Sequence, residues 1–215
     1  MSRLLVVDLL AEREAFGEHG VAEIAKHFPG YELFLWAPHT KEHRTYPFGI
    51  RVENVVEADV IVITGSRRNV SEWEPWMDAV EELIQNTEVP LYGICFGHQI
   101  ICKALGGKVK RSRAKSHFMA EVTYNDGKKV NQLFTHQDHV TDSGELEVTA
   151  SAEHCNIAAC KHPTRKIITV QYHPEAVKEV LEQSLICGDM SQDERDDFGL
   201  GIQDFDVSQA FGLIN

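Results

Sequence analysis

Residues 89–101 have the sequence VPLYGICFGHQII, and this stretch decides how the chain folds. An apolar run typical of a buried strand breaks at Cys95 and continues with apolar residues at helical spacing. Gly93 and Gly97 stand two residues before and after the cysteine, where a Cβ would collide with the neighbouring backbone. The pattern predicts a strand, a strained turn and a helix, with the Cys95 sulfur exposed at the carboxyl end of the strand.

The predicted turn offers two features that a cysteine nucleophile needs. The backbone N–H of Phe96 opens the helix, where it can stabilise a developing oxyanion. The positive end of the helix also favours a thiolate at Cys95. A G-x-C-x-G match is weak by itself, because a buried cysteine in a tight turn is common. A catalytic interpretation therefore depends on a base elsewhere in the chain.

A candidate base follows a second predicted strand, far along the chain. Residues 167–172 have the β-branched pattern of a strand and lead into His173, Pro174 and Glu175. Side chains two apart in extended backbone point to the same side, so we expect Glu175 to reach the His173 imidazole. We therefore predict Cys95 as the nucleophile, His173 as its base and Glu175 as the carboxylate that orients the base.

Cysteine, histidine and glutamate in this order, within GICFGHQ and QYHPE, resemble the class I (triad) glutamine amidotransferases. The segment THQDHV at 135–140 and the turn at 64–66 extend the resemblance, most closely to free-standing homologues of the GMP synthetase amidotransferase domain. The resemblance implies an α/β fold, with an open, mostly parallel, flavodoxin-like sheet flanked by helices and a small antiparallel annex. It also implies that Cys95 attacks the γ-amide of glutamine, forming a γ-glutamyl thioester that water hydrolyses.

The same resemblance assigns further residues to the site. The turn with Gly65 and Ser66 corresponds to the one that supplies the second oxyanion N–H in the family. Gln99 follows the nucleophile by one helical turn and corresponds to a residue that contacts the substrate. His136 and Asp138 lie near the family's cleft, and both a structural and a substrate-binding role stay open for them.

Two segments after the predicted helix call for separate expectations. Residues 115–119, KSHFM, stand where the family has a glycine-bearing segment whose backbone recognises the amino-acid end of the substrate. Phe118 is our candidate contact there, and the bulkier residues would reshape the pocket. The five basic residues within 108–115 are expected to lie in a solvated loop rather than a docking patch. His98 is expected to be a packed, structural histidine.

Length and composition limit the remaining possibilities. We expect a single domain over residues 1–215, with a core at about 1–187 and an acidic, then apolar, extension at about 188–215. The net charge of -12 disfavours nucleic acid and anionic membrane surfaces as partners. No signal-peptide pattern precedes the first predicted strand, so a cytoplasmic location is expected, which also suits five irregularly spaced cysteines.

Motifs for cofactors are missing from the sequence. Neither C-x-x-C nor H-E-x-x-H spacing occurs, so no metal is expected. The phosphate-binding G-x-x-x-x-G-K-[ST] and dinucleotide-binding G-x-G-x-x-G patterns are also missing, so no cofactor is expected. An amidotransferase without its own ATP-using domain would need a partner synthetase to use the ammonia.

Three functions remain open from the sequence. The first is a glutamine amidotransferase that releases ammonia from glutamine for a partner synthetase. The second is a stand-alone γ-glutamyl hydrolase or peptidase, which would act on larger γ-glutamyl amides with the same chemistry. The third is a non-catalytic sensor in which Cys95 responds to oxidants. The predicted pair of His173 and Glu175 favours the two enzymes.

Overall fold

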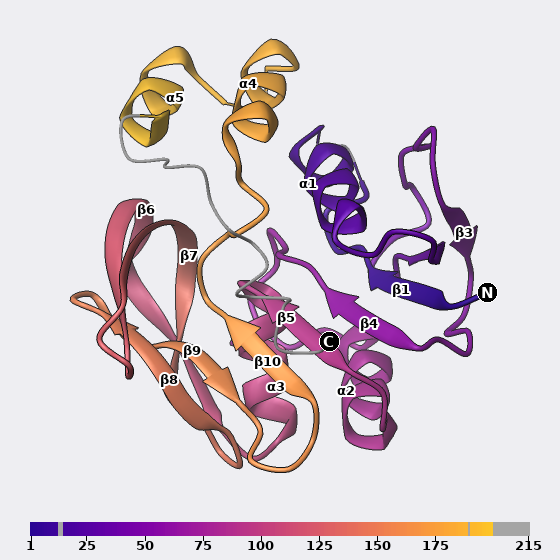
Figure 1. Ribbon diagram of the computed structural model, residues 1–215, viewed down its shortest axis with the longest axis horizontal. Helices are drawn as coiled ribbons and strands as arrows, with labels where there is room; N and C mark the ends of the chain where they lie inside the picture. The colour runs from indigo at the N-terminus through magenta and orange to yellow at the C-terminus, as the bar shows by residue number, and fades with distance from the viewer. Residues whose placement is uncertain (13–14, 189, 200–215) are drawn as a thin grey trace.

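The computed structural model describes residues 1–12, 15–188 and 190–199. Its described strands form one ten-stranded sheet in the order β3-β2-β1-β4-β5-β10-β9-β8-β6-β7 (Figure 1). The first six strands of this order run parallel to one another: β3 (Ile50–Val52), β2 (Glu32–Trp36), β1 (Arg3–Val7), β4 (Val60–Ile63), β5 (Leu91–Ile94) and β10 (Ile167–Val170). The open, mostly parallel α/β sheet predicted from the sequence is therefore confirmed.

The antiparallel part of the sheet extends from β10. It comprises β9 (Cys155–Lys161), β8 (Glu147–Ala152), β6 (Lys108–Tyr124) and β7 (Lys129–Asp142). The antiparallel annex is thus present, but it continues the main sheet, and β6 and β7 are long. The basic residues within 108–115 lie in β6, so the expected loop is wrong. Their side chains are mostly exposed, which allows the strand to carry so many charges.

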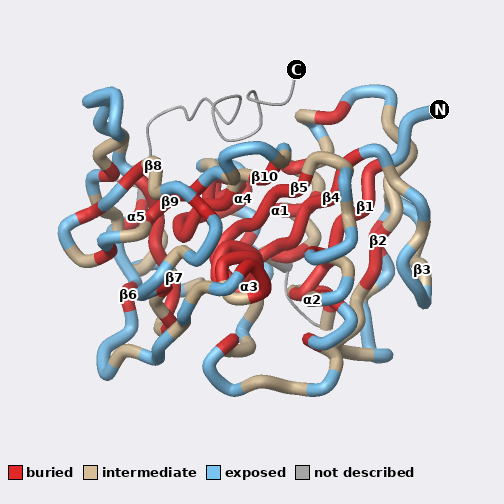
Figure 2. The backbone as a smooth tube through the Cα atoms, turned by 90° about the horizontal axis from the view of Figure 1, so that it is seen from below, coloured by how far each residue is buried: buried red, intermediate tan, exposed pale blue. Residues whose placement is uncertain are grey.

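Helices cover both faces of the parallel strands (Figures 1 and 2). The helix α1 (Ala15–Lys26) packs on one face, where its apolar side chains meet alternate strand residues such as Leu4 and Val6. The helices α2 (Trp76–Asn86) and α3 (Phe96–Ala104) pack on the other face, against Leu5 and Val7. This alternation is expected of a strand buried on both sides, since successive side chains point to opposite faces.

Two helices follow β10 in the described part of the chain. The helix α4 (Lys178–Ile186) packs against α1, and α5 (Gln192–Gly199) packs against α4 and β6. The acidic start of the predicted extension thus forms α5, whose Phe198 is buried. The rest of the predicted extension, residues 200–215, lies outside the described residues.

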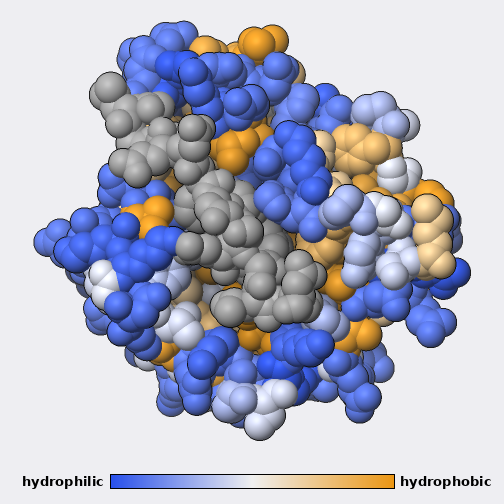
Figure 3. Space-filling view, in the orientation of Figure 1, coloured by the Kyte–Doolittle hydropathy of each residue, from blue (hydrophilic) through white to orange (hydrophobic). Residues whose placement is uncertain are grey.

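The described surface in Figure 3 is mostly hydrophilic, with small, separate apolar patches. This pattern agrees with the large net charge of -12. Within residues 1–12, 15–188 and 190–199, no helix is long and apolar enough to cross a membrane.

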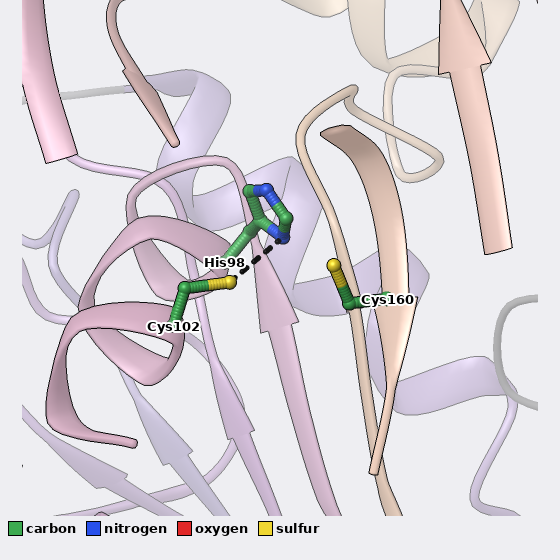
Figure 4. Close-up of side chains that lie close together, drawn as sticks. All are labelled: His98, Cys102 and Cys160. Carbon is green, nitrogen blue, oxygen red and sulfur yellow. Dashed lines mark hydrogen bonds between the residues drawn. The ribbon is translucent and has the colours of Figure 1, made fainter. Parts of the chain in front are cut away.

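His98 anchors α3 to the sheet (Figure 4). Its Nε2–H donates to the carbonyl oxygen of Ile157 at 3.2 Å, and its Nδ1 accepts from the Thr169 hydroxyl at 2.7 Å. Cys102 lies one turn later on α3, and Cys160 comes from β9. Both imidazole nitrogens are therefore satisfied within the core, and the predicted structural role of His98 is confirmed.

Substituting His98 with glutamine should reduce the loss of stability in acid. Burial lowers the pKa of His98 from 6.5 to about 4. Between these two pH values the unfolded chain therefore binds a proton at His98, whereas the folded chain does not. The free energy of unfolding should therefore fall as pH drops below 6.5, by about 3 kcal/mol at pH 4 from this group alone. Glutamine keeps a donor and an acceptor but does not titrate.

The measurement is urea unfolding of both proteins between pH 7 and pH 4. Between pH 7 and pH 4, the free energy of unfolding of wild type should fall by about 3 kcal/mol more than that of His98→Gln. Parallel curves would contradict the prediction, because they would mean that His98 titrates equally in both states.

Candidate active site

Cys95 occupies the turn between β5 and α3 in an unusual backbone conformation. Its φ is 52° and its ψ is -100°, and it is the only non-glycine residue with positive φ in the described part of the chain. Its N–H donates to the carbonyl oxygen of Val170 in β10 at 2.8 Å. A Cβ on Gly93 would lie 2.6 Å from the carbonyl group of Gly97, so the predicted need for a glycine there is confirmed.

His173 and Glu175 lie in the turn after β10, close to the elbow. The His173 Nδ1–H donates to Glu175 Oε1 at 2.8 Å, and both side chains are buried. The His173 backbone N–H donates to Leu133 in β7 at 2.9 Å. The expected contact is present, but the segment is a turn closed by Ala176 N–H on the His173 carbonyl, so the extended backbone assumed from the sequence is wrong.

The pKa of His173 is raised well above 6.5. Burial by itself would lower this pKa, but the charges of Cys95 and Glu175 and the hydrogen bonds to both side chains raise it more. The imidazolium form is therefore favoured at neutral pH. It is held between the carboxylate on one side and the Cys95 sulfur on the other. Phe16 packs edge-on against the His173 ring with centroids 5.8 Å apart.

Thr135 lies between the cysteine and the histidine. Its hydroxyl oxygen is 2.9 Å from His173 Nε2, and its carbonyl oxygen is 3.7 Å from the Cys95 sulfur. Gly65 flanks the same two residues, because a Cβ there would lie 3.0 Å from His173 Cε1 and 3.6 Å from Cys95 Cβ. Thr135 was not among the predicted site residues, although it begins the THQDHV segment.

The N-terminus of α3 opens beside Cys95. The first hydrogen bond of α3 is made by the Gln99 N–H to the Cys95 carbonyl, so the Phe96 N–H precedes the intrahelical bonds. Ser66 lines the cavity beside Phe96, and its hydroxyl accepts from the Arg68 N–H at 3.1 Å. Both predicted oxyanion segments therefore reach the same cavity.

Two of the expected substrate contacts are already engaged with the protein. Asp138 accepts from the Ser71 N–H at 2.7 Å and from its hydroxyl at 2.8 Å. Gln99 Nε2 donates to the Asp138 carbonyl at 2.9 Å and to Gln171 Oε1 at 3.0 Å. Asp138 and Gln99 thus tie the loop after β4 to β7 and α3. Both still line the cavity, as His136 does.

Phe118 does not line the cavity. It is 41% exposed and packs edge-on against His154, with ring centroids 4.7 Å apart. Its neighbours Ser116 and His117 line the cavity instead. The predicted segment thus reaches the site, but through residues other than the one singled out.

The cavity around Cys95 has a volume of about 430 Å³. Its described walls come from the elbow, from β6 and β7, and from α5, which contributes Phe198. His117 fixes α5 here, since its Nε2 lies 3.1 Å from Glu194 Oε1 and its ring packs on Phe198 with centroids 4.9 Å apart. The lining includes three basic side chains: Arg67, Arg68 and Lys115. Such a cavity suits a small anionic or zwitterionic ligand.

An open α/β sheet with a cysteine elbow beside a buried histidine–carboxylate pair is typical of enzymes that attack carbonyl carbons through a cysteine. The family model described as glutamine amidotransferase class-I matches residues 37–190. The chain belongs to this family. The resemblance drawn from the elbow and from QYHPE is therefore confirmed.

Known relatives agree with this family. The chain is 32% identical over 155 residues to a glutamine-hydrolyzing GMP synthase from Caldicellulosiruptor saccharolyticus, covering 66% of this chain and 29% of that protein. It is 37% identical over 125 residues to a protein from Methanocaldococcus jannaschii that is named as one subunit of a glutamine-hydrolyzing GMP synthase, covering 50% of this chain and 65% of that one. The match thus spans less than two thirds of either relative.

A solved structure supports the fold. The crystal structure of a glutamine amidotransferase from Thermotoga maritima has a TM-score of 0.71 to this chain. The sequences are 17% identical, and the superposition covers 93% of this chain and 90% of that one. At this identity the likeness shows a shared fold.

Proposed function

We propose that this protein hydrolyses the γ-amide of glutamine, with Cys95 as nucleophile, and supplies the ammonia to a partner synthetase. The observation that carries the proposal is the shared cavity, in which the elbow cysteine lies beside His173 while Glu175 holds the histidine at 2.8 Å. Membership of the glutamine amidotransferase class-I family supports glutamine as the amide.

The proposed reaction has two steps. The Cys95 sulfur attacks the γ-carbonyl carbon, the carbon–nitrogen bond breaks, and the nitrogen leaves as ammonia after taking a proton from His173. Water then attacks the γ-glutamyl thioester and gives a proton to His173, the carbon–sulfur bond breaks, and glutamate is released with the Cys95 sulfur and the His173 imidazolium restored. The raised pKa of His173 suits the first step, because the imidazolium is already present to protonate the leaving nitrogen.

Each tetrahedral intermediate places negative charge on the former carbonyl oxygen. The Phe96 N–H, ahead of the first α3 hydrogen bond, and the backbone of Gly65 and Ser66 are the proposed donors. Asp138 would support them indirectly, since its two hydrogen bonds to Ser71 hold the loop that carries Ser66. We assign Gln99 and Asp138 as positioning residues, because their polar atoms already bind protein groups.

A partner synthetase is proposed from the relatives. The name of the Methanocaldococcus jannaschii relative describes it as one subunit of a GMP synthase, and the matched part of the Caldicellulosiruptor saccharolyticus protein is less than a third of its length. In this proposal, the chain supplies the glutamine-hydrolysing part, and a separate protein activates the ammonia acceptor.

Two observations favour the second candidate, a stand-alone γ-glutamyl hydrolase. The cavity of about 430 Å³ lies in the range that holds drug-sized ligands, and free glutamine is much smaller. Lys115 and His117 also line this cavity in the segment where the family carries glycine. A larger γ-glutamyl compound would fill the space that glutamine leaves.

The two candidates differ in what the purified protein hydrolyses by itself. Glutamate release should be measured with glutamine and with a panel of γ-glutamyl peptides and amines, with and without cell extract. Glutamine as the preferred substrate, with turnover increased by extract, is the expected result. Preference for larger γ-glutamyl compounds without extract would support the hydrolase instead. No release from any of them under either condition would contradict both.

A further inference from the structure

Three side chains of the kinds that can bind a metal ion lie together at the wall of the active-site cavity. His136 and His139 come from β7, and Cys155 begins β9. Their potential ligand atoms all lie within 4.8 Å of one another. The rings of His136 and His139 have centroids 4.5 Å apart, and His154 lies next to them, with its centroid 5.9 Å from that of His136.

One ring nitrogen of His136 is placed to coordinate a metal ion. Its Nδ1–H donates to the Asp138 carbonyl at 2.9 Å, which leaves the lone pair of a neutral imidazole on Nε2. This Nε2 is buried and has no hydrogen-bond partner among the described residues, although His136 is only 7% exposed. Metal-binding histidines usually have this arrangement, with the other ring nitrogen donating to a backbone carbonyl.

Two residues of this cluster are three positions apart on one strand. In a regular strand, positions three apart point to opposite faces. The pairing of β6 with β7 is irregular between Arg111 and Ser116, opposite the stretch from His136 to Asp138. The extra residues of this irregularity lie in β6, and the sequence spacing did not reveal the cluster because positions 136 and 139 of one strand are expected on opposite faces.

A second cluster in the core makes a useful contrast. The potential ligand atoms of His98, Cys102 and Cys160 also lie within 4.8 Å of one another, and the three side chains are drawn in Figure 4. Both nitrogens of His98 already have protein partners, in Thr169 and Ile157. A metal there would have to displace these bonds in a fully buried region, so this cluster serves packing.

We propose that His136, His139 and Cys155 form a binding site for a zinc ion. One thiolate and two imidazoles are the ligands that Zn²⁺ prefers, and a water molecule or His154 would complete the tetrahedron. Ligand atoms about 2.0–2.3 Å from zinc lie roughly 3.5 Å from one another, so small side-chain movements would suffice. Binding forms a bond from the Cys155 sulfur to zinc and releases the thiol proton to water.

The ion would lie beside the catalytic machinery. His136 also lines the cavity, and Cys155 belongs to the same apolar cluster as Cys95. His139 is partly exposed, which gives the ion a route from solvent. Bound zinc would join β7 to β9 at the wall of the active site. Cys95, His173 and Glu175 are not among the proposed zinc ligands.

The test is a zinc titration of the metal-free full chain in competition with a chromophoric chelator. Wild type should bind one Zn²⁺ per chain, and Co²⁺ in its place should give a thiolate charge-transfer band. Cys155→Ala and His139→Ala should each weaken binding by at least about a hundredfold. The first should also abolish the band. His139→Ala guards against misfolding, because His139 is partly exposed.

Two further variants separate this site from the other thiols. Cys160→Ala tests the packed cluster, and Cys95→Ala tests direct binding by the nucleophile. Both should bind zinc as wild type does. Absence of binding in wild type, unchanged binding in Cys155→Ala and His139→Ala, or loss of binding in either control variant would overturn the proposal.

Discussion

Cys95→Ala should abolish glutamate release, lowering kcat/KM by at least about ten-thousandfold. The reaction proposed here passes through a bond between the Cys95 sulfur and the γ-carbon, and the described cavity holds no other cysteine. The oxyanion donors and the substrate contacts would remain, but they give only the residual catalysis that survives without a nucleophile. The measurement is the steady-state rate of glutamate release over a range of glutamine concentrations, with the protein well below the glutamine concentration.

The control for this experiment is Cys187→Ala. Cys187 is exposed, directly after α4, and it does not line the cavity, so its removal should leave kcat and KM unchanged. Both variants should retain the far-ultraviolet circular dichroism of wild type. Residual turnover in Cys95→Ala above about one part in ten thousand would argue for a different nucleophile.

Gly97→Ala should destabilise the fold by more than about 3 kcal/mol. An added Cβ would lie 2.2 Å from the carbonyl oxygen of Ile63 and 3.0 Å from its carbonyl carbon. Ile63 ends β4, which is paired with β1 on one side and β5 on the other, so this backbone cannot move away. Alanine is the better helix former, but that preference is too small to offset a backbone clash. Thermal and urea unfolding measure the loss.

Gly127→Ala is the matched control. Gly127 has a φ of +88° and nothing within 4 Å of the added Cβ, so only the cost of a left-handed conformation remains, roughly 1–2 kcal/mol. The two variants thus separate steric exclusion from backbone preference. Equal losses at both positions would mean that α3 can shift away from β4, and the elbow would then be less rigid than we infer.

The elbow was predictable from sequence because its constraints are local. Two glycines around Cys95 and the change from a strand pattern to a helix pattern describe one tight turn, and the structure has that turn. The family was predictable for a related reason, since QYHPE adds a second, independent segment. The contact between His173 and Glu175 was also anticipated, although a turn and not extended backbone brings them together.

Strand pairing and contacts between residues far apart in the sequence were harder to predict from local patterns. The basic residues of 108–115 have the composition of a loop, but they lie in a strand, in which Lys108, Lys110 and Arg111 pair with β7. Phe118 was expected in the cavity, but the placement of β6 turns it toward His154. Thr135 depends on the placement of β7 beside the elbow, so no local pattern assigns it. The described start of the C-terminal extension became a helix through packing against α4 and β6.

The backbone conformation of Cys95 also affects which substitutions evolution would favour at this position. A side chain held at φ 52° and ψ -100° costs about 1–3 kcal/mol of folding free energy, and glycine at the same position would avoid most of that cost. The active form is therefore not the most stable form available to this chain. Under the proposed function, selection for turnover and selection for stability act in opposite directions at this one residue. A homologue that is no longer selected for catalysis would gain stability if Cys95 were replaced by glycine.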